Sequence, residues 1–421
     1  MSSETPTADG PSHLPSHLPS HSPSHLPSHL PLHPRKRPTS AFSSFWMAGF
    51  EGADHVDLHG NPLDMVSITG HESQFPSDYA RAASLGLNTV RESVGWRICA
   101  PTDSRKLSFL RMETAAEAAM TQGVQVLWSL MHYGMPPDIQ VTDVDFADRF
   151  ADFAGAAARR LTQLTGGGGI YNPINEIGFL AWALATQNIL GGACSERDGY
   201  VVKYKLVQAA LRGRDAILAE DPLARFIHVE PLIHVAPPAT DTTLAQAAAD
   251  FCGYQWQVWD MLSGRSAAEL GGSPQAVDWI GVNHYHDSQW EIGSGSRLDW
   301  HCGDARRRAF SDLLEETWRR YGVPIVVAET SHVGEGRALW LNDIATQTEL
   351  AIARGVAVDG ICLYPAVDRP DWNNQSHWHR SGLWDAIAPG QTEADPPSSI
   401  SRRLAEQYAA ALGQCQKRLP G

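Results

Sequence analysis

The stretch IYNPINEIGF, residues 170–179, places a carboxylate where a buried strand should end. Asn175 and Glu176 stand side by side there, and an unpaired buried charge is costly, so Glu176 needs a partner or a function. A second apolar run, PIVVAETSHVG at 324–334, carries Glu329 toward its end. Two carboxyl groups in one partly dry pocket do not both ionise easily, so one pKa rises, and the pair supplies a general acid and a base or nucleophile.

The segments that must position these residues are of two alternating kinds. Short β-rich runs are separated by Ala- and Leu-rich stretches whose apolar residues recur at three- and four-residue spacing, as in amphipathic helices. The eight predicted strands are 45–52, 88–96, 124–134, 169–178, 225–235, 277–286, 324–334 and 358–368. Helices are predicted over 146–164, 200–220, 305–322 and 339–355.

Eight strands alternating with helices predict an α/β fold with a parallel sheet closed on itself, the (β/α)8 or TIM barrel. An open doubly wound sheet is the rival, but no Gly-x-Gly-x-x-Gly opens the first helix. The glycine-rich TGGGG at 165–169 precedes a strand, so it is interpreted as a helix-to-strand turn. The barrel domain is expected over 41–421. Residues 1–40 repeat Ser-His-Leu-Pro and are expected to form a disordered tail, because dense proline blocks helix and sheet.

Polar side chains gather at the end of every predicted strand, where barrel enzymes build their active sites. Glu176 ends the fourth strand and Glu329 the seventh, so we expect them to face one another across the mouth of the barrel. Two facing carboxyl groups can catalyse the hydrolysis of a glycosidic bond. A separation of about 5–5.5 Å is typical of enzymes that retain the anomeric configuration, and about 6.5–9.5 Å of enzymes that invert it.

Motifs spread over roughly residues 45–388 resemble those of glycoside hydrolase family 1, the β-glucosidases and β-galactosidases, which are retaining glycosidases on (β/α)8 barrels. In chain order these are RESVGWRICAP with Arg91, MHYGMP with His132, PINEI with Asn175 and Glu176, GVNHY with Asn283 and Tyr285, and VVAET with Glu329. The segment YPAVDRPDW matches the family's strand-eight segment in length and carries Asp371 and Trp372.

The resemblance implies that Glu176 is the acid/base and Glu329 the nucleophile of a retaining β-glycosidase that needs no cofactor. The other matched residues are implied to bind the sugar or support the nucleophile: Asn175 at the 2-OH, His132 at another hydroxyl, Asp371 and Trp372 at the outer hydroxyls, and Arg91, Asn283 and Tyr285 beside Glu329. Flat surfaces for stacking on sugar faces are expected from Trp96, Trp128, Trp290, Trp372 and Trp384.

Several positions depart from the family pattern. Ile177 follows the acid/base where the family has Pro, Tyr364 replaces a Trp, and Asp371 replaces a Glu. The segment FEGADHV lacks the family's sugar-binding Gln, and Glu51 or Asp54 takes its place. We interpret the chain as a divergent branch.

For other polar residues near the strand ends, the sequence favours non-catalytic roles. Glu230 is followed by Pro and lacks a preceding Asn, which favours structural support. A metal site at His284, His286 and His332 is disfavoured because no His/carboxylate spacing there is diagnostic. A 6-phosphosugar substrate has no support, with Arg380 as the only nearby cation to consider.

The composition argues against some classes of binding partner. The net charge of −14 and pI of about 5.7 argue against nucleic acid and anionic membranes, and no run of 18 apolar residues is present. Six scattered cysteines and an N-terminus without a secretory signal favour a cytoplasmic protein. The expected partner is a small-molecule glycoside or oligosaccharide, and the oligomeric state stays open. The alternatives are a catalytically inactive carbohydrate-binding barrel and a metal-dependent hydrolase.

Overall fold

The computed structural model describes residues 41–186, 189–191, 194, 196–387 and 400–419, and the predicted tail at 1–40 lies outside them. Parallel strands close into a barrel in the order β1-β10-β9-β7-β5-β4-β3-β2. The barrel strands are β1 (Trp46–Gly49), β2 (Thr89–Ser93), β3 (Gln125–Met131), β4 (Ile170–Ile174), β5 (Arg225–Pro231), β7 (Trp279–Asn283), β9 (Ile325–Thr330) and β10 (Val358–Leu363). Each lies inside one predicted run, so the predicted (β/α)8 barrel is confirmed.

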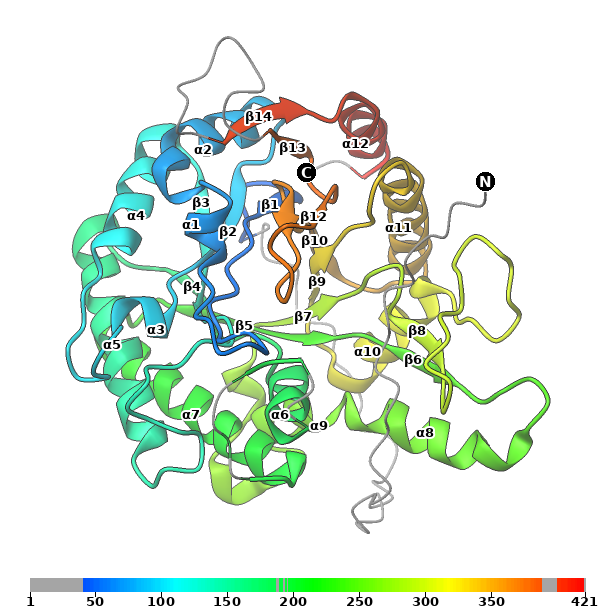
Figure 1. The fold of residues 1–421 in the computed structure, drawn as a ribbon, viewed down its shortest axis with the longest axis horizontal. Helices are drawn as coiled ribbons and strands as arrows, with labels where there is room; N and C mark the ends of the chain where they lie inside the picture. Colours follow the sequence, from blue (N-terminus) through cyan, green and yellow to red (C-terminus); the bar gives the residue numbers. More distant parts are fainter. Residues whose placement is uncertain (1–40, 187–188, 192–193, 195, 388–399, 420–421) are drawn as a thin grey trace.

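Helices surround the barrel on its outside (Figure 1). They are α1 (Met65–Ile68), α2 (Phe75–Ser84), α3 (Trp96–Cys99), α4 (Leu110–Gln122), α5 (Phe146–Thr165), α6 (Ile177–Thr186), α7 (Gly199–Glu220), α8 (Ala245–Tyr254), α9 (Gln257–Leu262), α10 (Phe310–Tyr321), α11 (Gly336–Ala353) and α12 (Glu406–Arg418). The helix predicted from 305 begins five residues later, because Ala309 is extended at the N-cap of α10 and Arg306 turns back to pair with Asp304.

Successive side chains along each barrel strand point alternately into the barrel and toward the helices, so the protein has an inner and an outer hydrophobic core. Residues on one face pack in the barrel interior beneath the mouth: Met47, Leu127, Ile170, Ile227, Val229, Trp279, Val326, Ala328 and Cys362, joined by Phe42. Residues on the other face pack against the helices, as Val327 and Ile361 do. The interior is filled by side chains, so the chemistry is confined to the mouth.

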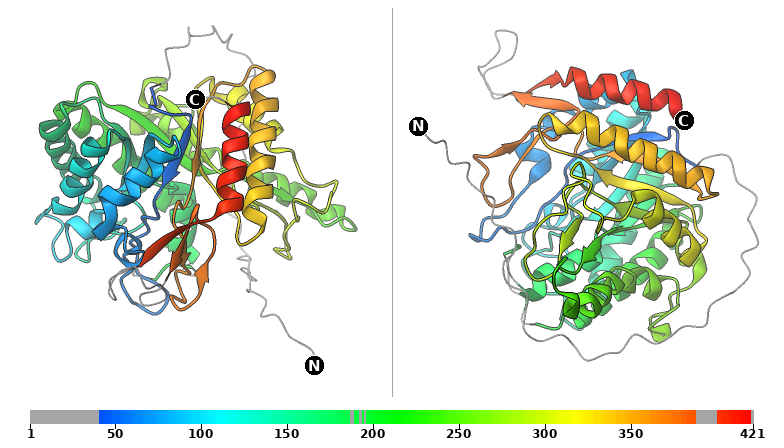
Figure 2. Two further views of the ribbon diagram at one scale, coloured as in Figure 1. Left: turned by 90° about the horizontal axis from the view of Figure 1, so that it is seen from above. Right: turned by 90° about the vertical axis from the view of Figure 1, so that its right-hand side faces the viewer.

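Within the described residues, three short two-stranded sheets lie outside the barrel. They pair β6 (His234–Ala236) with β8 (Gln289–Glu291), β11 (Arg369–Pro370) with β12 (Trp378–His379), and β13 (Trp384–Ile387) with β14 (Ser401–Leu404). The sheet of β13 and β14 leads into α12, which lies beside α11 in both views of Figure 2. These additions come mainly from the loops that follow the fifth, sixth and eighth barrel strands.

The glycine-rich segment ends α5 as the sequence predicts. Gly166 adopts a φ of +87°, a conformation that suits glycine, and the amides of Gly168 and Gly169 donate to the Asp221 carboxylate at 2.8 and 2.9 Å. The segment is therefore a turn fixed by the Asp221 carboxylate. It is not a phosphate-binding loop.

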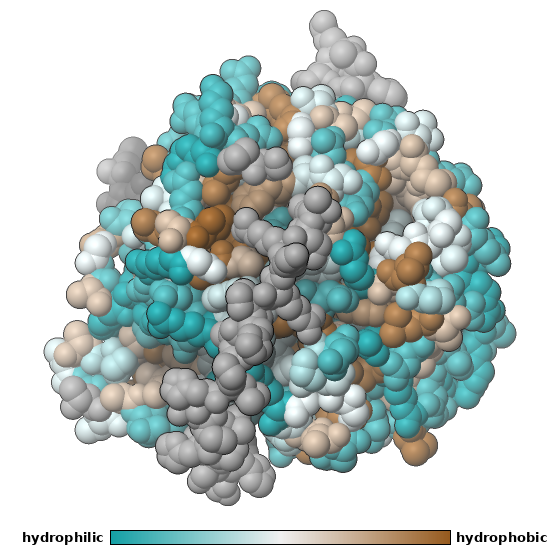
Figure 3. Space-filling model, turned by 180° about the vertical axis from the view of Figure 1, so that it is seen from behind, coloured by the Kyte–Doolittle hydropathy of each residue, from teal (hydrophilic) through white to brown (hydrophobic). Residues whose placement is uncertain are grey.

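The outer surface is that of amphipathic helices around a core. Hydrophilic side chains cover much of the face in Figure 3, with hydrophobic ones between them. Among the described residues, no helix has the length and apolar character needed to cross a membrane.

Candidate active site

Glu176 occupies the junction between β4 and α6. Its amide donates to the Val229 carbonyl at 2.9 Å, and its carbonyl accepts the Leu180 amide at 2.8 Å, so it ends the strand and begins the helix. Its φ of +46° is uncommon for a residue with a side chain. Such conformations persist where the surrounding structure enforces them, and they cluster at functional sites.

Glu329 points into the mouth because the ladder around β9 is irregular. The register shifts between Val282 and Asn283 on one side of β9, and between Ile361 and Leu363 on the other. Ala328 already packs in the barrel interior, yet the next side chain, Glu329, also reaches inward. An extra residue of this kind re-aims side chains beside active sites.

The Glu329 carboxylate has a charged donor and a neutral donor. Arg91 donates from Nη1 to Oε1 at 2.5 Å, and the Tyr285 hydroxyl donates to Oε2 at 2.6 Å. Arg91 is only 1% exposed and is also held by the Ser129 hydroxyl at 3.2 Å. A buried ion pair stabilises the ionised carboxylate, which is the form that attacks as a nucleophile.

The Glu176 carboxyl lies in a different environment, with two uncharged donors. The Asn283 amide donates to Oε1 at 2.7 Å, and the Tyr133 hydroxyl donates to Oε2. Burial and the nearby charge of Glu329 raise the pKa of Glu176 to about 7, against the lowering effect of these hydrogen bonds. At neutral pH this group therefore holds or gives up a proton with little cost, as a general acid/base requires.

Asn175 connects the two carboxyl groups. Its Oδ1 accepts from Nη2 of Arg91 at 2.6 Å, and its Nδ2 lies 3.2 Å from Nε2 of His132 and 3.3 Å from the Tyr133 hydroxyl. A continuous path of hydrogen bonds thus joins Glu329 to Glu176. The amide of Asn175 is completely buried, and its orientation is fixed from both ends.

His132 extends this network toward strand one. Burial and the charge of Arg91 hold the pKa of His132 well below its usual value, so the ring is neutral. If Nε2 accepts from Asn175, then Nδ1 carries the proton and donates to the Tyr364 hydroxyl, 3.4 Å away. Tyr364 in turn donates to Oε1 of Glu51 at 3.3 Å.

The structure separates the two candidates for the missing strand-one Gln. Glu51 lies in the mouth network, where Oε2 pairs with Nε of Arg369 at 3.0 Å, and burial raises its pKa. Asp54 instead accepts the Gly134 amide at 2.9 Å, which joins the loop after β1 to the loop after β3. Glu51 is therefore the residue placed to contact a ligand beside Tyr364.

Asp371 and Trp372 lie in the loop between β11 and β12. Asp371 fixes that loop, since its Oδ1 accepts the amides of Asn373 and Asn374 and its Oδ2 lies 3.3 Å from His379. The Trp372 ring meets Tyr133 edge to face at 5.7 Å, and the Arg369 guanidinium lies 5.5 Å from its centre. Trp372 thus belongs to the wall of the mouth.

Several buried polar atoms of the mouth have no hydrogen-bond partner among the described residues. They include Oδ1 of Asn283, Nε1 of Trp372 and both ring nitrogens of His55, whose ring lies 4.9 Å from that of Trp372. Buried polar groups are nearly always paired, so unpaired ones gathered in one place indicate a polar ligand. A molecule with many hydroxyl groups would satisfy donors and acceptors together.

Other sequence predictions fare differently. The stacking role is wrong for Trp96, which is fully buried among Phe146, Phe150 and Phe153. Spacing in the sequence could not distinguish this core tryptophan from one in the mouth. Trp128 and Trp384 also pack in the main core, and Trp290 lies against Phe251 in the small cluster around β6 and β8.

Two further predictions were a structural role for Glu230 and the absence of a metal site at His284, His286 and His332. The Glu230 carboxylate accepts the Gly178 amide at 2.8 Å at the start of α6, a structural contact. The His286 and His332 rings pack together at 4.0 Å, whereas His284 donates from Nδ1 to the Leu232 carbonyl at 2.7 Å. Within the part of the chain that the structure describes, no three His, Cys, Asp or Glu side chains are grouped to hold a metal ion.

Some neighbours of the pair were not singled out in the sequence. Tyr133 contacts Glu176, and Arg369 contacts Glu51. The side chain of Asn283, which the resemblance placed beside Glu329, donates to Glu176 instead, although its backbone is in register with Glu329. Tyr133 stands in the motif MHYGMP where the family has Trp. That substitution was the available signal for a hydroxyl near Glu176.

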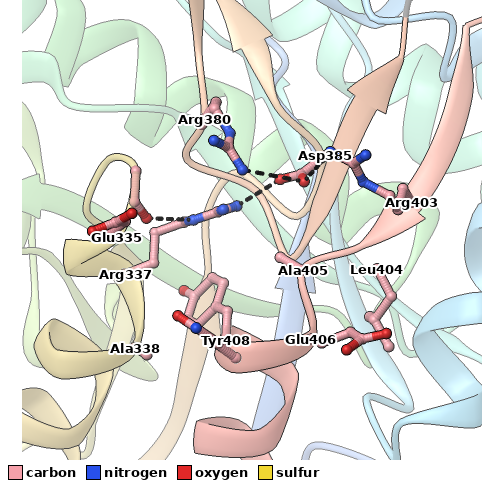
Figure 4. Close-up of a pocket in the computed structure, with 12 residues that line it drawn as sticks. Glu335, Arg337, Ala338, Arg380, Asp385, Arg403, Leu404, Ala405, Glu406 and Tyr408 are labelled. Carbon is pink, nitrogen blue, oxygen red and sulfur yellow. Dashed lines mark hydrogen bonds and ion pairs between the residues drawn. The ribbon is translucent and has the colours of Figure 1, made fainter. Parts of the chain in front are cut away.

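A separate cavity of about 380 Å³ lies beside the first turns of α11 and α12. Figure 4 shows Arg337, Arg380 and Arg403 converging on Asp385, with distances of 3.0, 3.5 and 3.1 Å. The described residues that line it include no member of the Glu176–Glu329 network. Arg380 therefore belongs to this ion-pair cluster.

Comparison with known proteins supports the fold. No family model matches the sequence, and no curated protein matches it either. Solved structures do match. The β-glucosidase from Thermotoga maritima in complex with glucoimidazole is 12% identical, with a TM-score of 0.69 over 89% of this chain and 98% of that one. The AHE enzyme from Alicyclobacillus herbarius is 14% identical, with a TM-score of 0.65 over 90% and 100%.

A third similar structure is the β-glycosidase BGL167, which is 19% identical, with a TM-score of 0.63 over 90% of this chain and 97% of that one. The matches cover nearly the whole length of each chain, and one is described as a family 1 β-glucosidase. At such low identity the likeness establishes the fold alone. The chain thus has the (β/α)8 fold of the family 1 β-glucosidases.

Proposed function

We propose that this protein is a retaining β-glycosidase that hydrolyses a small-molecule β-glycoside or oligosaccharide. The observation that carries the proposal is the contrast between two buried carboxyl groups in one network. Glu329 is paired with a guanidinium, whereas Glu176 has neutral partners and a raised pKa of about 7. A pair in which one group stays charged and the other carries a proton is the requirement for double displacement.

In the proposed first step, Glu329 attacks the anomeric carbon while Glu176 donates its proton to the leaving oxygen. The glycosyl group is then held as an ester of Glu329. In the second step Glu176, now ionised, takes a proton from water, which attacks the same carbon and releases Glu329. Asn175 and His132, next to both carboxyl groups, are proposed to bind sugar hydroxyls.

The main alternative is a carbohydrate-binding barrel that has lost catalysis, which the unusual residues around Glu176 and Glu329 motivate. The different surroundings of the two carboxyl groups favour the enzyme, since Glu329 is paired with Arg91 whereas Glu176 has neutral donors and a raised pKa. A metal-dependent hydrolase is the second alternative, and activity that survives a chelator would exclude it. We further propose a cytoplasmic location, because the six cysteines are scattered singly through the sequence, which does not suggest a disulfide framework.

The test is hydrolysis of a panel of nitrophenyl β- and α-glycosides by the wild type, Glu176→Ala and Glu329→Ala. We expect turnover of at least one β-glycoside, and its loss in both variants by about 10²-fold or more. Folding of each variant would be checked by its melting temperature. Equal activity of wild type and Glu329→Ala would contradict the proposal, and a wild type that binds sugars without turnover would favour the binding barrel.

A further inference from the structure

The acid/base and the tyrosine that contacts it share an unusual backbone conformation. Among the described residues, the non-glycine positions with positive φ are Tyr133 at +80°, Glu176 at +46° and Ala267 at +49°. Tyr133 and Glu176 are also hydrogen-bond partners, through the Tyr133 hydroxyl and Oε2 of Glu176. Two strained residues that contact one another at the end of neighbouring strands indicate a geometry maintained for function.

The Tyr133 ring is fixed on several sides. It packs edge to face on His132 at 4.7 Å and on Trp372 at 5.7 Å, and it lies 5.3 Å from Phe179. Its hydroxyl also accepts from Nδ2 of Asn175 at 3.3 Å, and the residue is 4% exposed. The hydroxyl therefore has no room to move away from Glu176 without disturbing its neighbours.

The two oxygens of Glu176 face groups with different capacities. The Asn283 amide nitrogen only donates, so Oε1 remains an acceptor whether Glu176 is ionised or not. The proton of the acid form is therefore carried by Oε2, beside a phenol that both donates and accepts. A tryptophan or phenylalanine at position 133 would lack this capacity.

We propose that Tyr133 is a positioning residue for the acid/base: its hydroxyl selects Oε2 of Glu176 as the proton-carrying oxygen and stabilises the ionised form that activates water. The inference rests on the proposed function for the roles of Glu176. It concerns a contact that the family resemblance does not supply, because the matching position of the family is Trp. Tyr133 acts through Glu176 and needs no contact with the sugar.

The charged and titratable groups around this pair come from every side of the mouth. They are Glu329 and Arg91, which interact electrostatically with Glu176, Glu51 beside Tyr133, Tyr285 on Glu329, and Glu230, whose neighbour is Lys203. Arg91 and Lys203 oppose the carboxylates in this set. Removing the Tyr133 hydroxyl changes one neutral donor and leaves these charges in place.

The experiment compares Tyr133→Phe with two matched hydroxyl deletions. Tyr285→Phe removes the donor to Glu329, and Tyr79→Phe removes a buried donor to Glu92, at 2.9 Å, away from the pair. In Tyr133→Phe the ionised form of Glu176 loses a donor, so its pKa rises, and the alkaline limb of kcat/KM against pH moves up by about one unit. Tyr285→Phe and Tyr79→Phe leave both donors of Glu176 in place, so neither should move this alkaline limb.

A second readout does not depend on turnover. The carboxyl carbon of Glu176, assigned by its loss in Glu176→Gln, is titrated by ¹³C NMR in wild type and in Tyr133→Phe. A midpoint about one unit higher in the variant supports the proposal. Identical midpoints in a folded variant overturn it, even if activity falls. If the wild type hydrolyses no glycoside, the proposed function fails, while the titration still decides whether Tyr133 controls Glu176.

Discussion

The Arg91 guanidinium holds the Glu329 carboxylate at 2.5 Å, and both side chains are buried, with 1% and 6% of their surface exposed. Removing one partner of such a pair leaves an uncompensated charge in the protein interior. Arg91→Met is therefore expected to lower the free energy of unfolding by about 3–5 kcal/mol. Urea denaturation of the purified variant measures the loss.

The matched control for this prediction is a surface ion pair. Arg354 lies 2.6 Å from Asp312, but both side chains are more than two-fifths exposed. Arg354→Met should cost far less stability than Arg91→Met, because water screens an exposed ion pair. Equal losses in the two variants would show that the Arg91 contact has no special contribution to stability.

The raised pKa of Glu176 predicts that activity and stability both decrease as the pH rises, over different ranges. In the proposed mechanism the acid form of Glu176 gives the proton to the leaving oxygen, so kcat/KM should fall as pH rises above about 7. Between about pH 4.5 and 7 the unfolded chain ionises this group while the folded protein keeps the proton. The unfolded state is then favoured progressively, by an amount on the order of 3 kcal/mol that is fully expressed above pH 7.

Glu176→Gln lacks this titration and supplies the comparison. The stability of the wild type relative to the variant should decrease from pH 4.5 to pH 7.5. Denaturant unfolding of both proteins at these two pH values tests the sign. A wild type that instead gained stability relative to Glu176→Gln over this range would show that the folded protein favours the ionised form.

The positions of Glu51 and Asp54 predict different effects for two similar substitutions. Glu51→Gln breaks the pair with Arg369 in the mouth, so kcat/KM should fall by about tenfold or more, with a modest change in stability. Asp54→Asn alters a contact between two loops, to the Gly134 amide, and should leave kcat/KM within about threefold. Steady-state kinetics on the best substrate would distinguish them, and a reversed order would place the sugar beside Asp54.

The two kinds of tryptophan should also respond differently. Trp372→Ala removes part of the mouth wall and is expected to raise KM with little change in melting temperature. Trp96→Ala opens a cavity among three phenylalanines and should destabilise the fold by about 3–5 kcal/mol. Thermal melts and KM values of both variants provide the check. A large KM effect from folded Trp96→Ala would contradict the assignment of that residue to the core.

The fold could be predicted from the sequence because all eight barrel strands are apolar runs that end in polar residues, separated by helices with clear three- and four-residue spacing. The pairing of Glu176 with Glu329 followed from the same pattern, since the carboxyl ends of parallel strands share one mouth. The two-residue strands of β11 and β12 were beyond prediction, because their pairing depends on contacts between loops.

The side-chain contacts within the site could be seen only in the three-dimensional structure. The side chain of Asn283 is directed to Glu176 because a shift in register accompanies the end of β7, and no periodic pattern encodes such a shift. The contact between Tyr133 and Glu176 depends on a positive φ angle at each residue. Tyrosine and glutamate rarely adopt such angles, so the residue types alone could not predict this contact. Local irregularities of this kind are where sequence patterns are expected to fail and where sites are built.

The most direct test of the central claim is the product formed when azide replaces the missing carboxylate. Glu329→Ala, given a dinitrophenyl β-glycoside and azide, should recover activity and release the α-glycosyl azide, because azide attacks from the face that Glu329 occupied. Glu176→Ala should instead give the β-glycosyl azide, since azide then opens the ester on Glu329. Rescue of Glu329→Ala with the β-anomer as product, or rescue in neither variant of an active enzyme, would contradict the assignment of Glu329 as nucleophile.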